Sequence, residues 1–220
     1  REPFSLQWYR KYILRRNLIT TSESITRFMK NGQAEWTYHF QEIRDNGGNR
    51  VLMQDVENNY KNNIWLPEPE KKFDFQNMNK SESTLNYYKQ ILDIAYRDGI
   101  EVEIIVSPFH ASLLEALDEV GLWSIFENWK KSLVEINEYL SRKYKVPAFS
   151  VWDYSGYNSI NTEAVPPLND TENLMMWFWD GTHFRPELGE IILDQLLDYK
   201  SDERTIPEDF GTIINSQNID

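Results

Sequence analysis

The sequence predicts an α/β fold, a three-layer sandwich in which helices cover both faces of a mainly parallel sheet. Its 220 residues, 40% of them hydrophobic, suit one sizeable core better than two domains. Two apolar runs, at residues 100–106 and 146–152, are typical of buried strands. Helical periodicity occupies the chain between and beside these runs, and such long crossover connections require parallel pairing of the strands.

Composition excludes several classes of function. The chain carries 35 acidic and 23 basic residues, a formal net charge of −12, so it lacks the basic surface that a nucleic-acid partner requires. It has no cysteine, which excludes disulfides and a cysteine nucleophile. No apolar run approaches the roughly 18–20 residues that cross a bilayer. The three histidines show no paired spacing, so we expect no metal site, and we expect no cofactor.

The N-terminal third gives the weakest pattern. Residues 4–29 show a loose helical periodicity, broken near Ser22 and Ser24, so we expect helix there. Residues 45–63 are crowded with Asn and Gly, and the prolines at 67 and 69 follow them. This composition predicts irregular structure up to about residue 70.

The pattern is sharper from residue 81 onward. Ser81 or Ser83 is a suitable N-cap for the helix that follows, and Gly99 is suited to its left-handed end. The run at 100–106 begins as alternation and ends as a continuous apolar stretch, as in a strand that enters a buried sheet. Two further helices are expected, at about residues 112–120 and 123–144.

The last part of the chain completes the predicted domain, residues 1–200. The strand at 146–152 is followed by a long loop and then by a helix for which Pro186 is suited to the first position. Residues 201–220 are expected to form a polar surface tail, anchored by Phe210, Ile213 and Ile214. Two strands are too few for this class, so we expect the fold to be incomplete at its N-terminus, with the other strands upstream of Arg1 or before residue 80.

One loop carries chemical content. Asp180 and His183 lie just before the last helix, where loops of open α/β sheets bind ligands. Gly181 lets the chain turn back, so the Asp180 carboxylate can accept a hydrogen bond from His183 Nδ1. Nε2 would then be free to act as a general base toward a serine hydroxyl.

This loop resembles the final block of the SGNH (GDSL-type) hydrolases. The residues that carry the resemblance are Asp180 and His183, followed by Pro186 and Gly189 on an apolar helix, and the strand–helix order over 81–200 agrees. Residues 146–157, ending Trp-Asp-Tyr-Ser-Gly-Tyr, are similar to bacterial membrane-linked relatives that act on cell-envelope polysaccharides.

The resemblance implies a flavodoxin-like sandwich and a catalytic triad. Asp180 and His183 would complete that triad with a serine of an N-terminal Gly-Asp-Ser block. The implied activity is that of an esterase or O-acyltransferase, with a small-molecule or glycan ester as substrate. The resemblance and the lack of cysteine favour an extracytoplasmic or membrane-anchored location, with membrane association through an N-terminal segment.

Two blocks of that family are missing from the sequence. There is no Gly-Asp-Ser and no Gly-x-Asn-Asp. Gly47-Gly48-Asn49 has only a superficial similarity to Gly-x-Asn-Asp. We therefore weigh two interpretations: either the nucleophile block lies upstream of Arg1, which we favour, or the chain is a non-catalytic relative that binds a glycan or a protein through aromatic side chains.

Several other residues have both a functional and a structural interpretation. His110 and Trp179 are candidate substrate-binding residues, although a helix-capping histidine and a core tryptophan are the commoner fates. Ser107 ends a strand as a nucleophile would, but Pro108 supplies no N–H for an oxyanion. A metal-assisted hydrolase built on Asp180, His183 and His110 is the last alternative, and His39 is expected to be structural.

Overall fold

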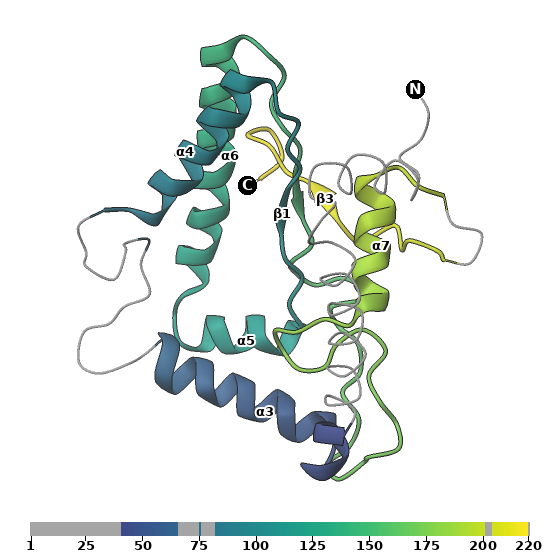
Figure 1. Cartoon of the computed structure of the whole chain (residues 1–220). Coiled ribbons are helices and arrows are strands. Elements are labelled where there is room, and N and C mark those ends of the chain that lie inside the picture. The colour runs from purple at the N-terminus through teal and green to yellow at the C-terminus, as the bar shows by residue number, and fades with distance from the viewer. Residues whose placement is uncertain (1–40, 66–74, 76–81, 201–203, 220) are drawn as a thin grey trace, which may run out of the picture.

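The computed structural model describes residues 41–65, 75, 82–200 and 204–219. The fold is mixed α/β, with a small sheet in the order β1-β2-β3 at its centre (Figure 1). The strands are β1 (Ile104–Val106), β2 (Val151–Asp153) and β3 (Thr212–Ile213). β1 and β2 are parallel, with Ile104 opposite Val151, as the crossover argument predicts.

The sheet is mixed, which corrects the expectation of a mainly parallel one. β3 runs antiparallel to β2 and places Thr212 opposite Asp153. It comes from the segment that we expected to be a polar tail. In that segment Phe210 and Ile214 are buried, at 1% and 8% exposure, so residues 204–219 are part of the packed fold. Polar composition concealed this, because few apolar side chains anchor the segment in the core: Phe210 and Ile214, with the partly buried Ile206 and Ile219.

Helices pack on two sides of the sheet (Figure 1). On one side, α4 (Thr84–Asp98) and α6 (Trp123–Tyr144) form a core with β1 and β2. On the other, α7 (Pro186–Leu196) packs with residues that follow β2 and precede β3. Its core includes Tyr154, Leu188, Ile191 and Phe210.

Local signals set the ends of these helices. The Ser83 hydroxyl accepts a hydrogen bond from the Leu85 N–H, and Gly99 ends α4 with a positive φ of 67°. Pro186 occupies the first turn of α7, where a missing N–H costs nothing. The predictions for these three helix boundaries and for the extent of α6 are therefore confirmed.

The expectation of irregular structure over residues 45–63 is wrong. Helix α3 (Asn49–Asn59) continues into a π-helical turn, η1 (Tyr60–Trp65). Asparagine is a weak helix former, but Met53 and Trp65 are almost fully buried, and α3 contacts α5 (Ala111–Glu119). Tertiary packing thus overrides local propensity. The helix expected at residues 4–29 and His39 lie outside the described residues.

Helix α5 follows β1 and lies at the carboxyl end of that strand, with α3 beside it (Figure 1). In the part of the chain that the structure describes, no helix is long and apolar enough to cross a membrane.

Candidate active site

Asp180 and His183 form the predicted hydrogen bond. His183 Nδ1 lies 2.8 Å from Asp180 Oδ2, inside the range of about 2.6–3.2 Å expected for such a pair. Asp180 Oδ1 accepts the backbone N–H groups of Thr182 and His183 at 2.7 and 3.0 Å. The carboxylate side chain is 14% exposed and the imidazole 69%. The aspartate is thus held within the loop, while the histidine ring projects from it.

The loop is a tight turn closed by its own backbone. Trp179 donates its N–H to the His183 carbonyl oxygen at 2.8 Å, and Arg185 donates to the Trp177 oxygen at 2.7 Å. Asp180 begins the turn, as aspartate commonly does, because its side chain can accept the N–H groups that follow. The sequence from Trp177 to Arg185 therefore presents Asp180 and His183 at the tip of a small hairpin.

This hairpin lies against the carboxyl end of β1. Four residues after that strand ends, His110 donates its backbone N–H to the Gly181 carbonyl oxygen at 3.1 Å. A β-carbon built on Gly181 would lie 3.5 Å from Leu113 Cβ of α5, at ordinary van der Waals distance, so the hairpin lies directly beside this helix. The pair is thus at the edge of the sheet where α/β proteins bind ligands.

The hydrogen bonds of His183 fix which nitrogen is basic. With Nδ1–H donated to Asp180, the lone pair is on Nε2. The Thr182 hydroxyl lies 3.0 Å from the same Nδ1 and donates to Asp180 Oδ1, so it supports the pair. No residue of the described ranges hydrogen bonds to Nε2. The exposed Nε2 can therefore accept a proton from a hydroxyl brought to it.

His110 is a helix cap. Its Nδ1 accepts the Ser112 backbone N–H at the start of α5, and its Nε2 lies 2.8 Å from the Glu163 carbonyl oxygen. The residue is 5% exposed, and burial lowers the pKa of its imidazole, which keeps the ring neutral. Since both nitrogens are occupied, the geometry gives no support to a substrate-binding role for His110.

His110 is also unsuited to the metal alternative, which would need one of those nitrogens. Among the described residues, no group of three or more Asp, Glu or His side chains is placed to hold a metal ion. Asp180 and His183 therefore form a pair in which His110 takes no part.

Trp179 is part of the core. It is 5% exposed, and the Arg185 guanidinium lies over its ring at 4.7 Å. Two further aromatic residues, Tyr154 and Phe178, are completely buried. Tyr157 is 57% exposed, and its hydroxyl donates to Glu115. The aromatic surface near the pair is thus smaller than the sequence suggests, and little of Trp179 can touch a substrate.

Two residues for which the sequence predicted no role at the site hold the segment before Asp180. Asn49, 1% exposed, donates from Nδ2 to the Trp179 carbonyl oxygen and accepts the Met175 N–H. The Glu163 carboxylate accepts the N–H groups of Met176 and Trp177, and burial raises its pKa. The one sequence signal was the Gly47-Gly48-Asn49 triplet, which brings the start of α3 against this segment.

Gly48 explains why that triplet is glycine-rich. Its φ is 97°, and a β-carbon there would collide with the backbone of Asp170. Glycine is therefore needed for the close approach that places Asn49 beside Trp179.

The described residues do not place a serine at His183 Nε2. Ser107 follows β1, but Pro108 comes after it, as the sequence already showed. The backbone N–H groups of Ala111 and Ser112 at the start of α5 are bonded to the Asn161 carbonyl oxygen and to His110 Nδ1. They are thus not available as an oxyanion hole.

Comparison with protein-family models, with curated proteins and with solved structures gives no match to this chain. Its function is therefore inferred from the geometry of the site and from the resemblance of the Asp180 block.

Proposed function

We propose that this chain is part of an SGNH-like serine hydrolase or O-acyltransferase that acts on an ester, with an acylated glycan as the substrate class. The observation that carries the proposal is the hydrogen bond of 2.8 Å between Asp180 Oδ2 and His183 Nδ1, with the imidazole exposed at the carboxyl edge of the sheet.

Each residue of the pair has one role in this reaction. Asp180 holds the imidazole in the tautomer with the proton on Nδ1 and stabilises the imidazolium that forms. His183 Nε2 takes the proton of a serine hydroxyl as that oxygen attacks the ester carbonyl, and returns it to the leaving alcohol. The acyl group then passes from the serine to water in a hydrolase, or to an acceptor hydroxyl in a transferase.

We propose further that the sheet belongs to a larger three-layer sandwich. Two observations support this: helices pack on two sides of the sheet, and in the described part of the chain β1 pairs on one edge alone. Ile105 of β1 is 46% exposed, which is unusual for a strand inside such a sheet. Further strands beside β1 would cover it, and the serine would follow one of them.

A fluorophosphonate probe tests the proposal, because it labels a serine only when a neighbouring base activates it. The natural full-length protein should be labelled on one serine, located by mass spectrometry of the labelled peptide. It should also release p-nitrophenol from p-nitrophenyl acetate. His183→Ala should abolish both signals, since loss of one triad member costs up to about 10⁶-fold in turnover.

The alternative is a non-catalytic module with an SGNH-like fold. It is favoured by one observation, that no serine of the described residues hydrogen bonds to His183 Nε2. If the full-length protein takes up no probe and cleaves no ester, while His183→Ala leaves its fold unchanged, the catalytic proposal fails and the module is preferred.

A further inference from the structure

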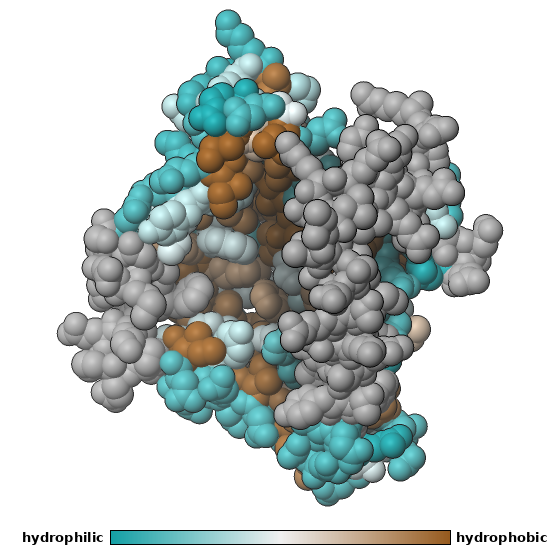
Figure 2. All heavy atoms as spheres, in the orientation of Figure 1, coloured by the Kyte–Doolittle hydropathy of each residue, from teal (hydrophilic) through white to brown (hydrophobic). Residues whose placement is uncertain are grey.

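A second feature lies close to the hairpin of Asp180 and His183. It is an apolar pocket of about 450 Å³ between η1, the loop after β1, α5 and the start of α6. Its size lies in the range of about 300–1,000 Å³ that is usual for ligand pockets. On the face shown in Figure 2, hydrophobic residues line a hollow between α6 and α5.

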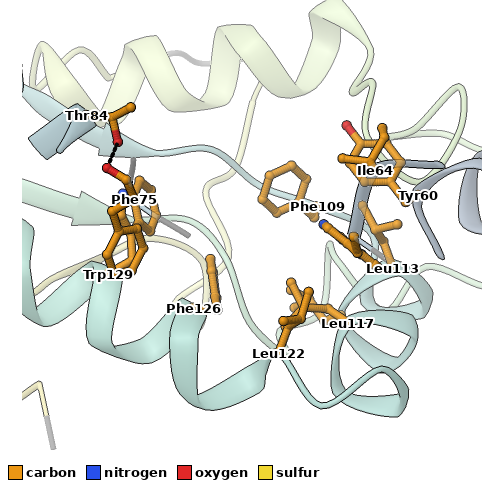
Figure 3. Close-up of a pocket in the computed structure, with 12 residues that line it drawn as sticks. Tyr60, Ile64, Phe75, Thr84, Phe109, Leu113, Leu117, Leu122, Phe126 and Trp129 are labelled. Atoms are coloured by element: carbon orange, nitrogen blue, oxygen red, sulfur yellow. Dashed lines mark hydrogen bonds between the residues drawn. The ribbon is translucent and has the colours of Figure 1, made fainter. Parts of the chain in front are cut away.

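The wall of the pocket is almost entirely hydrocarbon. Figure 3 shows Phe109, Leu113 and Ile64 on one side and Phe126 and Trp129 on the other. None of the lining residues that the structure describes carries a charge. The hydroxyl of Thr84, which is also in the wall, donates to the Phe75 carbonyl oxygen at 2.9 Å (Figure 3).

The apolar, uncharged wall determines which kind of ligand group the pocket can bind. A sugar or a peptide would leave its hydroxyl, N–H and C=O groups without partners against such a wall, which costs free energy. A charged ligand would lose its hydration without gaining an ion pair. The part of an ester substrate that has no polar atoms is the hydrocarbon chain of its acyl group, and the pocket can bury that chain alone.

The wall of the pocket is packed against the hairpin of the candidate active site. Leu113 lines the pocket and lies against Gly181, between Asp180 and His183. Phe109, another lining residue, precedes His110, whose backbone N–H is bonded to the Gly181 oxygen. An acyl chain held in the pocket would thus lie next to the hairpin that carries His183.

We propose that this pocket binds an unbranched acyl chain of medium length, so that the substrate is a medium-chain ester and not only an acetyl ester. This inference rests on the proposed function, because it takes the acyl group to be the one transferred at His183. Its first test is binding without hydrolysis, which can succeed or fail independently of catalysis.

The probes are n-alkyl β-glucosides with hexyl, heptyl and octyl chains, used below their critical micelle concentrations. They join an alkyl chain to an uncharged sugar through a glycosidic bond, which no esterase cleaves. Calorimetry should show an affinity that rises about fourfold for each methylene that is buried. Methyl β-glucoside, which has no chain, should not bind. The His183→Ala variant should bind octyl glucoside as the wild type does, since it leaves the pocket intact.

Two variants locate the binding. Leu117→Trp narrows the pocket from α5, and Ile64→Asp places a charge at its rim, where Ile64 is 41% exposed. Each should weaken octyl glucoside binding at least tenfold. Their matched controls are Leu193→Trp on α7 and Ile94→Asp on α4, at exposed sites outside the pocket wall, with 55% and 46% exposure. Both controls should bind as the wild type does, and circular dichroism should show all four variants folded.

The outcomes separate the pocket from the catalytic proposal. Affinity that does not depend on chain length, or that the two pocket variants leave unchanged, overturns the inference. Cleavage of p-nitrophenyl acetate without alkyl glucoside binding would leave the hydrolase standing and remove the acyl-chain pocket. Chain-dependent binding, together with a kcat/KM that rises from acetyl to octanoyl esters and loses this rise in Leu117→Trp, supports the inference in full.

Discussion

At the scale of single residues, Asp180 and His183 differ in the way that a catalytic pair requires. The carboxylate is held by two backbone N–H groups of its own turn, whereas the imidazole is held only on its Nδ1 side. Because the loop fixes the Asp180 carboxylate beside Nδ1 of His183, the loop itself determines that the imidazole carries its proton on Nδ1 and leaves Nε2 exposed as the base. His110 shows the opposite arrangement, since both of its nitrogens are occupied and its ring is buried.

The burial of His110 leads to a prediction of how the free energy of unfolding depends on pH. In the folded chain, burial lowers the pKa of this imidazole below that of an unfolded histidine, about 6.5. Between the two pKa values the unfolded chain binds more protons, so the free energy of unfolding falls as the pH drops below about 6.5. Urea unfolding at about pH 7.5 and about pH 5 should show a larger loss for the wild type than for His110→Asn.

Asparagine is a suitable replacement because its side chain also caps a helix and does not titrate. The Glu163 carboxyl, whose pKa is raised by burial, acts in the opposite direction and is present in both proteins. Equal losses in the two proteins would show that His110 is protonated as easily when folded as when unfolded.

At the scale of elements, capping residues predicted the helices well, and composition predicted them poorly. Ser83, Gly99 and Pro186 each have a local physical role, so the boundaries of α4 and α7 could be placed from the sequence. Helix α3 could not, because its stability comes from packing against α5 and from Asn49, which no local pattern reveals.

Asn49 therefore gives a prediction about α3. Replacing it with alanine leaves the Met175 N–H and the Trp179 carbonyl oxygen without these buried partners. Each such group costs about 1–3 kcal/mol, so Asn49→Ala should lower the free energy of unfolding by about 2–6 kcal/mol. Denaturant unfolding measures this. Asn58→Ala, an exposed site on the same helix, is the control and should change stability by less than about 0.5 kcal/mol. A similar loss of stability at both sites would mean that the buried hydrogen bonds of Asn49 do not determine the stability of α3.

At the scale of the whole molecule, the sequence predicted the parallel pairing of β1 with β2 but not the third strand. β3 has two residues, both exposed, and no alternating pattern marks it. The same limit applies to the site. The Asp180–His183 pair follows from local spacing, whereas the apolar pocket joins residues from 60 to 129 and is visible only in the folded chain.

Phe210 tests whether the C-terminal segment belongs to the core. Its ring is 1% exposed and packs 5.0 Å from that of Tyr154. Phe210→Ala should cost about 3–5 kcal/mol of stability, as for other buried phenylalanines. Ile213→Ala, three residues later and 43% exposed, should cost far less. Thermal unfolding of both variants compares these losses of stability. A small loss in Phe210→Ala would show that residues 204–219 are a surface tail and not part of the core.

The central claim is that Asp180 orients His183 for catalysis, and one pair of variants tests it most directly. Asp170 holds its own turn as Asp180 does, accepting the N–H groups of Glu172 and Asn173, but no bond to a histidine is found there. The measurement is kcat/KM for p-nitrophenyl ester hydrolysis by the natural full-length protein. Asp180→Asn should lower it about 10³- to 10⁴-fold, and Asp170→Asn should leave it within about twofold of the wild type. Equal activity of the two variants, whether both are retained or both are lost, would contradict the account.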